Sequence, residues 1–115
     1  MKVFVSQRHK DRTSEELASM SDSVVRKIRE TSVPEVIEVP MLLPEQFKGM
    51  HPVYYLGMNL QMMCQADLVI FEKGWEESRA CQVEHEVCDR YGLPYLELDC
   101  DPEEWDGDVN EARVH

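Results

Sequence analysis

Four short apolar runs divide this chain, and segments with helical periodicity lie between them. Each run suits a strand that is buried on both faces of a sheet. A connection that contains a helix carries the chain back to the same edge of the sheet, so successive strands become parallel. The expected strands cover 2–6, 36–39, 67–71 and 93–98. The alternation predicts an α/β protein: a small flavodoxin- or Rossmann-like three-layer sandwich around a four- or five-stranded, mainly parallel sheet.

The order of the strands predicts where a ligand would bind. Right-handed crossovers give the order 2-1-3-4, with the first strand central. In such sheets, ligands bind at the carboxyl ends of the strands where the order reverses. We therefore expect the loop 6–12, after the first strand, and the loop 74–79, after the third strand, to face one crevice.

Three helices are expected between the strands. Thr13 and Glu16 form a capping-box pattern at the start of a helix that runs to about Glu30. Pro52 suits the first turn of a second helix, after an irregular loop over 41–51. The third helix covers 79–90, and Gly92 ends it.

Charge and composition limit the location and partners of the chain. Its 23 acidic and 12 basic residues give a net charge of −11, and phosphate backbones are bound by basic surfaces, so we expect no nucleic-acid polymer as a partner. No apolar run approaches the roughly 20 residues that cross a bilayer, and the apolar start is too short for a secretory signal. We expect no membrane association, and a cytoplasmic protein whose four cysteines are reduced.

One group of side chains has the spacing of metal ligands. Cys81, His85 and Cys88 fall on one face of the third expected helix. A zinc site would need this clustering and a fourth ligand. The simpler interpretation, which we favour, makes both cysteines small core residues. We expect no metal and no cofactor.

The chain changes character after Leu98. Residues 99–111 hold seven acids and show no period. We therefore expect one domain over 1–98, and an acidic C-terminal tail over 99–115 that is solvated. Trp105 could anchor this tail to the body or to a neighbouring subunit.

Ser78 and Arg79 begin the third expected helix. Backbone amides and the positive end of the helix dipole favour an anion there, and the hydroxyl and guanidinium add donors that suit phosphate. Ser78 is also a typical N-cap, so both interpretations stay open. Basic residues of the loop 6–12, Arg8 among them, could line the opposite wall of the crevice.

Glu84 lies on the second turn of the same helix. The helix start is close enough for the dipole to favour the ionised carboxylate. An ionised carboxylate can attack the anomeric carbon of a sugar and form a covalent glycosyl intermediate. Considered alone, however, a helical glutamate is most often a surface charge.

Four motifs carry a resemblance to a known family. They are F-V-S-Q-x-x-x-x-x-T near the N-terminus, A-D-L-V-I-F, G-W-x-x-S-R-x-C-x-x-E-H-E and Y-G-L-P. Over roughly 1–98, the chain resembles a family of small uncharacterised phage and bacterial proteins related to the nucleoside 2-deoxyribosyltransferases. That superfamily includes enzymes that exchange bases on deoxyribose and N-glycosidases that hydrolyse deoxynucleoside 5′-monophosphates.

The resemblance implies roles for particular residues. Glu84 matches the nucleophilic glutamate, and Ser78 matches a serine that contacts the 5′-phosphate in the monophosphate glycosidases. Asn59 stands where the active enzymes carry an aspartate that assists catalysis, and asparagine cannot pass a proton. The resemblance implies catalysis by Glu84 and Asn59. Residues of both loops would bind the nucleotide, and we expect these to be Ser6, Gln7, Arg8, Ser78 and Arg79. Gly74 and Trp75 would line the pocket.

Further positions depart from the family pattern. Ala80 replaces a usual glycine, and an added Cβ there could narrow the approach of a ligand. Arg8 and Asp11 stand where the family usually has proline and glycine, and Asp11 would repel a nearby phosphate.

These observations lead to two main hypotheses. The first is an enzyme that cleaves the N-glycosidic bond of deoxynucleoside 5′-monophosphates through Glu84. The alternative is a nucleotide-binding module without turnover, a sensor or sequestering protein, which the change to Asn59 would suit. An interaction protein that acts through the acidic tail is a third. The resemblance also implies a homodimer or higher homo-oligomer, because a neighbouring subunit often completes the site in this superfamily.

Overall fold

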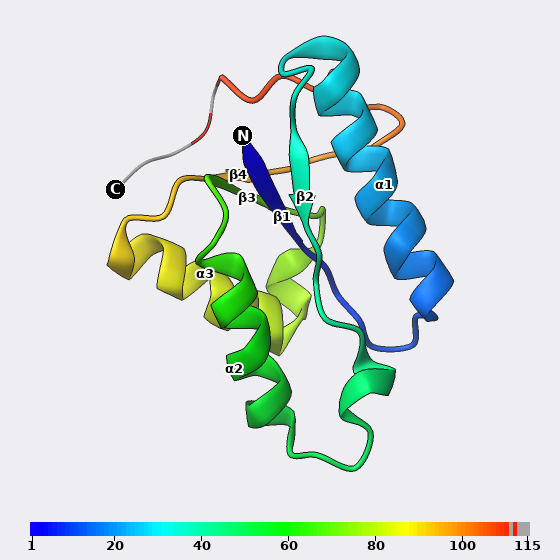
Figure 1. Ribbon diagram of the computed structural model, residues 1–115, viewed down its shortest axis with the longest axis vertical. Helices are drawn as coiled ribbons and strands as arrows, with labels where there is room; N and C mark the ends of the chain where they lie inside the picture. The colour runs from blue at the N-terminus through cyan, green and yellow to red at the C-terminus, as the bar shows by residue number, and fades with distance from the viewer. Residues whose placement is uncertain (111, 113–115) are drawn as a thin grey trace.

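A computed structural model describes residues 1–110 and 112, and Figure 1 shows the arrangement of its elements. The four strands form one sheet in the order β2-β1-β3-β4, and every neighbouring pair is parallel. This confirms the predicted α/β class and strand order. The strands are β1 (Lys2–Ser6), β2 (Ile37–Val39), β3 (Leu68–Phe71) and β4 (Tyr95–Glu97), and the helices are α1 (Ser14–Thr31), α2 (Pro52–Met63) and α3 (Arg79–Tyr91), with short 3-10 turns η1 (Pro44–Phe47) and η2 (Trp75–Glu77).

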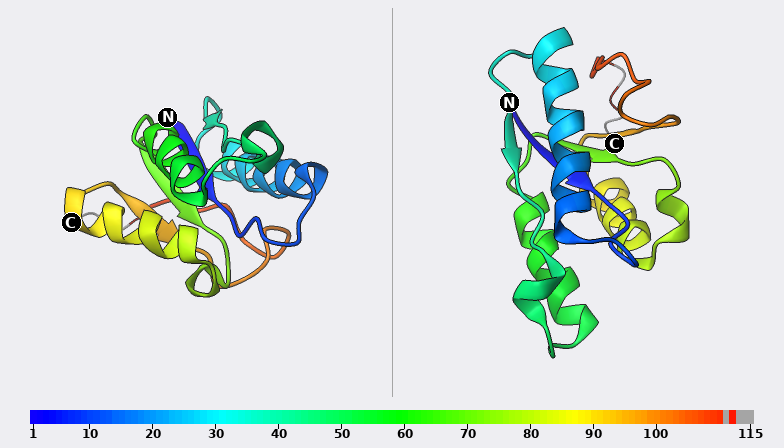
Figure 2. Two further views of the ribbon diagram at one scale, coloured as in Figure 1. Left: turned by 90° about the horizontal axis from the view of Figure 1, so that it is seen from below. Right: turned by 90° about the vertical axis from the view of Figure 1, so that its right-hand side faces the viewer.

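The sheet is covered on both faces. Side chains alternate along β1, so Val3 and Val5 belong to one apolar cluster and Phe4 belongs to the other. The first cluster includes Ile28 of α1, whereas the second includes Met63 of α2 and Cys88 of α3. Figure 2 shows the resulting layers, with α1 on one side of the strands and α2 and α3 on the other.

Local signals determine where the helices begin and end. The Thr13 hydroxyl accepts a hydrogen bond from the Glu16 N–H at 3.1 Å, and the Glu16 carboxylate accepts one from the Thr13 N–H, which confirms the capping box. Pro52 occupies the first turn of α2, and Gly92 ends α3, as expected. No helix in the described part of the chain is long and apolar enough to cross a membrane.

The segment after β4 differs from its prediction. Trp105 is buried in the cluster beneath α1, so the expectation of a solvated tail is wrong for the stretch around it. Lys27 of α1 donates a hydrogen bond to the Glu103 carbonyl at 3.1 Å, and the Ser32 hydroxyl donates one to the Gly107 carbonyl at 2.7 Å. Trp105 anchors the segment to the body, which was one of the two predicted possibilities. Within the predicted tail 99–115, positions 111 and 113–115 lie outside the described residues.

Candidate functional site

The loops that follow β1 and β3 meet at the carboxyl edge of the sheet. Ser6 and Phe71, the last residues of the two strands, are neighbours in the parallel register. The Arg8 Nη1 lies 3.6 Å from the Glu77 Oε2. A Cβ built at Gly74 would lie 3.2 Å from the Arg8 guanidinium carbon, so the glycine allows this close contact. The sheet topology therefore brings these loops together, as strand order predicts.

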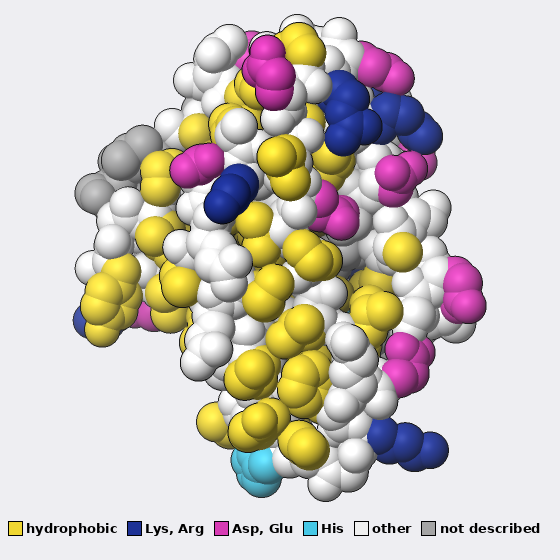
Figure 3. All heavy atoms as spheres, viewed as in Figure 1, with side chains coloured by type: hydrophobic (Ala, Val, Ile, Leu, Met, Phe, Trp, Pro, Cys, Tyr) yellow, Lys and Arg dark blue, Asp and Glu magenta, His cyan; other side chains and the backbone are white. Residues whose placement is uncertain are grey.

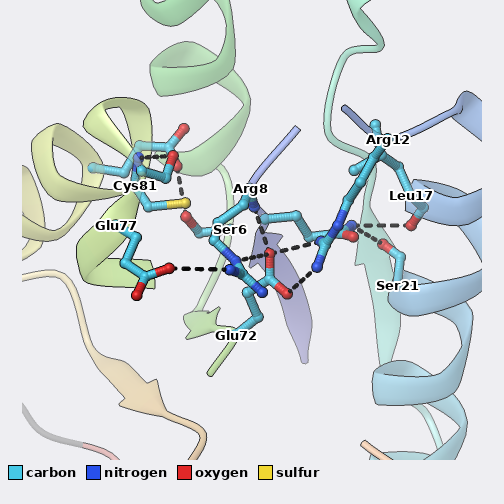
Figure 4. A network of polar contacts seen from close by, with 11 residues as sticks. Ser6, Arg8, Arg12, Leu17, Ser21, Glu72, Glu77 and Cys81 are labelled. Atoms are coloured by element: carbon cyan, nitrogen blue, oxygen red, sulfur yellow. Dashed lines mark hydrogen bonds and ion pairs between the residues drawn. The ribbon is translucent and has the colours of Figure 1, made fainter. Parts of the chain in front are cut away.

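Glu72, the residue after β3, holds the basic loop in place. Its side chain is only 2 % exposed. The carboxylate accepts hydrogen bonds from the Arg8 backbone N–H at 2.5 Å and from the two terminal nitrogens of Arg12 at 2.7 and 3.0 Å (Figure 4). Glu72 is not among the site residues predicted from the sequence. An acidic residue directly after a wholly apolar strand was the available signal, because such a position is buried and requires a partner.

A cavity of about 800 Å³ lies on the α1 side of this edge. Glu72 and Gly74 line it together with Arg8 and Arg12, and both arginines are already paired with Glu72. The ionisable side chains around it are three cations and six carboxylates, namely Arg8, Arg12, Lys73, Glu15, Glu16, Glu72, Glu77, Asp101 and Glu103. This balance disfavours a free phosphate in the cavity.

Glu84 lies on the other side of the sheet, where α2 and α3 pack. The Ser6 hydroxyl donates a hydrogen bond to the Glu84 Oε1 at 2.6 Å. The glutamate is 3 % exposed, and no ion pair involves it among the described residues. The serine and the glutamate, both predicted site residues, are thus in direct contact at the edge where ligands bind in α/β proteins.

Burial controls the ionisation of Glu84. Desolvation raises its pKa to about 7, and the Ser6 hydrogen bond, which lowers the pKa, does not compensate. Burial therefore outweighs the effect of the helix dipole, which was expected to favour the ionised carboxylate. The dipole acts within the first turn, whereas the carboxyl group is almost entirely removed from water.

Asn59 is buried on α2. Its Oδ1 accepts a hydrogen bond from the Leu42 N–H at 2.7 Å, and the Tyr55 hydroxyl donates one to the Leu42 carbonyl at 2.6 Å. Burial raises the pKa of Tyr55 to about 12, and the charge of Glu84 raises it more weakly. The asparagine therefore fastens the segment after β2 to α2, and contacts Glu84 through no direct hydrogen bond in the described structure.

Ser78 is the N-cap of α3, and its hydroxyl oxygen accepts a hydrogen bond from the Cys81 N–H at 3.3 Å. This supports the N-cap interpretation. The neighbouring Arg79 is exposed. Burial raises the pKa of the Cys81 thiol to about 11. The thiol therefore stays protonated at neutral pH and is a poor nucleophile.

The remaining predicted residues point elsewhere. Gln7 is buried toward α1, where its amide donates to the Leu17 carbonyl at 3.0 Å and to the Ser21 hydroxyl at 3.2 Å. Trp75 stacks on His85, with ring centroids 3.9 Å apart and an interplanar angle of 6°. Each therefore has a packing role in addition to any contact with a ligand.

The possible metal ligands on α3 are separated by their packing. Cys81 and Cys88 are fully buried. His85 instead places its Nε2 2.6 Å from the Glu97 Oε2. Among the described residues, no group of three or more histidine, cysteine, aspartate or glutamate side chains could hold a metal ion.

Comparisons with known proteins place the chain in one family. Searches of the curated proteins and of the solved structures gave no match. The family model described as "Domain of unknown function (DUF4406)" matches residues 22–96, which is more than half of the chain and extends from α1 to β4. The matched part includes Asn59, Ser78 and Glu84 but not Ser6. The chain therefore belongs to the DUF4406 family.

Proposed function

We propose that this protein cleaves the N-glycosidic bond of a deoxynucleoside 5′-monophosphate, with Glu84 as the nucleophile. The observation that carries the proposal is the isolated, buried Glu84 carboxyl group, held by the Ser6 hydroxyl at the carboxyl edge of a parallel sheet. Burying a carboxyl group without a cation costs stability, and such costs are concentrated at functional sites. The resemblance to the nucleoside 2-deoxyribosyltransferases supplies the reaction class.

The proposed reaction begins with the ionised form of Glu84. Its Oε2 attacks the anomeric carbon and forms a C–O bond, while the C–N bond breaks and its electron pair leaves with the base, which takes a proton from solvent. Water then hydrolyses the glycosyl ester, so that the sugar phosphate is released and Glu84 is restored. The hydrogen bond from Ser6 leaves Oε2 available for the attack.

The phosphate would bind at the amino end of α3. The Ser78 hydroxyl and the exposed Arg79 side chain flank the first turn of this helix, where free backbone N–H groups favour an anion. Arg8 is a weaker candidate than its position in the loop suggests, because Glu72 and Glu77 already balance its charge. The substrate range must therefore be tested with the uncharged nucleosides as well.

Binding without turnover is the second candidate function, and the environment of Asn59 favours it. This residue cannot donate a proton as an acid, and its carbonyl oxygen is occupied by the Leu42 N–H. The Glu84 carboxyl group is also almost fully covered. A site of this kind could bind an intact nucleotide and leave its glycosidic bond unbroken.

The test uses a panel of deoxynucleosides and deoxynucleoside 5′-monophosphates, with free base measured by chromatography and binding measured by calorimetry. The parent protein is compared with Glu84→Gln, which removes the nucleophile but keeps a hydrogen-bond acceptor for Ser6. Glu86→Gln is the matched control, because Glu86 is an exposed glutamate on the same helix, paired with Arg90 at 2.5 Å.

We expect base release by the parent protein and the Glu86→Gln variant, and none by Glu84→Gln. Nucleotide binding without base release by the parent protein would select the second candidate function. If the protein neither binds nor cleaves any member of the panel, both candidates are wrong. Release of base by Glu84→Gln at the parental rate would reject Glu84 as the nucleophile.

A further inference from the structure

The second step of the proposed reaction needs a group that accepts a proton. In this step water attacks the anomeric carbon and loses a proton as the glycosyl ester breaks. Glu84 cannot take this proton, because its carboxylate is the leaving group of the same step. In glycosidases that retain configuration, a second side chain on the other side of the sugar activates the water. A rapid second step therefore requires another base that is free near neutral pH.

α2 does not supply this base. The stretch 49–65, which contains the whole of α2, has no aspartate, glutamate, lysine or arginine. Figure 3 shows hydrophobic side chains gathered over α2 and the segment before it, while the charged groups of this view lie around their margin. The Asn59 amide accepts no proton. Burial raises the pKa of Tyr55 to about 12, so its hydroxyl stays protonated, and the His51 Nδ1 already accepts a hydrogen bond from the Val53 N–H at 3.1 Å.

His9 lies in the loop after β1 and is directed toward the side of the sheet that holds Glu84. Its ring centroid is 5.1 Å from that of Tyr55 on α2, in an edge-to-face arrangement. Gln7, two residues earlier, instead reaches the Leu17 carbonyl of α1 on the opposite side. The loop therefore places an imidazole between the end of β1 and α2.

Two links place His9 close to the candidate nucleophile. It follows Ser6 by three residues, so their Cα atoms are at most about 11 Å apart, and the Ser6 hydroxyl contacts Glu84. The Tyr55 ring, which contacts His9, has its pKa raised by burial and, more weakly, by the charge of Glu84. In retaining glycosidases the nucleophile and the second group are about 5 Å apart, with the reacting carbon between them. His9 can therefore serve a sugar bound on Glu84 without contacting the glutamate itself.

The imidazole of His9 has the form that a general base needs. Burial lowers the pKa of this half-buried side chain, so at neutral pH the ring carries one N–H and one nitrogen that can accept a proton. In the part of the chain that the structure describes, neither ring nitrogen of His9 has a hydrogen-bond partner. The accepting nitrogen is therefore available to a water molecule.

We propose that His9 is the general base of the second step. Its free nitrogen takes a proton from the water whose oxygen attacks the anomeric carbon. As the new C–O bond forms, the bond between this carbon and Glu84 breaks, and its electron pair returns to the carboxylate. The imidazolium then gives its proton to solvent. This role rests on the proposed function, and it accounts for Asn59, because proton transfer is supplied by the loop after β1 instead of α2.

The test follows free base and the intact mass of the protein during the first turnovers with a mixture of the common deoxynucleoside 5′-monophosphates. The ester on Glu84 has one mass whichever base has left, because only the deoxyribose phosphate remains. The parent protein should release base steadily and carry little ester. His9→Asn should release about one base per protein at the parental rate and then slow by about 100-fold or more, while the ester accumulates.

Two further variants separate this role from an effect on folding. His51→Asn is the matched control, because His51 is exposed at the start of α2 and asparagine also caps a helix well. Its turnover should stay within about twofold of that of the parent protein, because it leaves His9 in place. His9→Ala leaves room for a small base, so added imidazole should raise its turnover by about tenfold or more, which a purely structural role does not explain.

The outcomes distinguish this inference from the proposed function. A parent protein that releases no base and forms no ester overturns the proposed function, and the role of His9 with it. If the parent protein releases base but His9→Asn turns over at the same rate or forms no ester, only the role of His9 is overturned. The same conclusion follows if imidazole has no effect on a His9→Ala variant that unfolds at the parental urea concentration.

Discussion

Replacement of Glu84 by glutamine should stabilise the protein in a way that depends on pH. In the unfolded chain this carboxyl group has its ordinary pKa of 4.5, whereas burial raises the pKa to about 7 in the folded state. Because the folded state binds the proton more tightly, the parent protein loses stability as the pH rises from about 4.5 through about 7, and the loss then levels off. At roughly 1.4 kcal/mol per pKa unit, the difference between the two pKa values corresponds to a loss of about 3 kcal/mol in the free energy of unfolding.

The glutamine side chain has no proton to lose in this range. The stability of the Glu84→Gln variant relative to the parent protein should therefore increase with pH. The part of the stability difference that arises from ionisation is about 1 kcal/mol at pH 5 and about 3 kcal/mol at pH 8. Any constant cost of burying the amide shifts both values equally. The pH dependence therefore isolates the carboxyl group.

The assay is urea unfolding of both proteins at a series of pH values from 5 to 8, with the free energy of unfolding extrapolated to water. Glu86→Gln is again the control, because water screens the exposed Glu86–Arg90 pair and the difference should stay small across the series. The reasoning would be refuted if the difference in unfolding free energy between Glu84→Gln and the parent protein did not change with pH. It would mean that the Glu84 carboxyl group is solvated or paired in the folded protein.

Three other substitutions test separate parts of the structure. Glu72→Gln should lower the free energy of unfolding by about 2 kcal/mol. The loss should be smaller than for a fully buried pair, because the Arg12 side chain is 25 % exposed. Urea unfolding measures this free energy, and an unchanged value would contradict the pairing of Glu72 with Arg12. Trp105→Ala should cost about 3 kcal/mol in the same assay, whereas a solvated tail predicts almost none. Ser6→Ala should move the pH midpoint of the Glu84 effect above 7, because the lost hydrogen bond lowers the pKa; a midpoint that stays in place would contradict this contact.

The fold could be predicted because its signals are local. The apolar runs and the Thr13–Glu16 capping box are each contained within a few residues, and the right-handed crossover rule then orders the strands. The packing of the C-terminal segment could not be predicted in the same way. Trp105 belongs to an apolar cluster that also contains residues of α1 and β1, which lie far from it in sequence, whereas the acids around it suggest solvent. Composition alone gives no information about such a long-range contact.

The candidate site was predictable only in part for the same reason. Ser6 and Glu84 could each be identified from motifs, but their hydrogen bond joins residues 78 positions apart. The basic loop after β1 could be recognised in the sequence, whereas the neutralisation of Arg12 depends on Glu72, which follows another strand, β3. The direction of the Glu84 pKa shift likewise depends on how completely the packed structure removes the carboxyl group from water.

Two buried glutamates at one sheet edge thus have opposite surroundings. Glu72 is paired with Arg8 and Arg12, so its loss would leave guanidinium groups without their partner. Glu84 has one neutral donor, Ser6, and its pKa of about 7 allows it to gain or lose a proton near neutral pH at little cost. The cavity of about 800 Å³ lies beside the first, but the carboxyl group suited to acid–base or nucleophilic chemistry is the second. The search for a substrate should therefore begin on the side of the sheet that α2 and α3 cover.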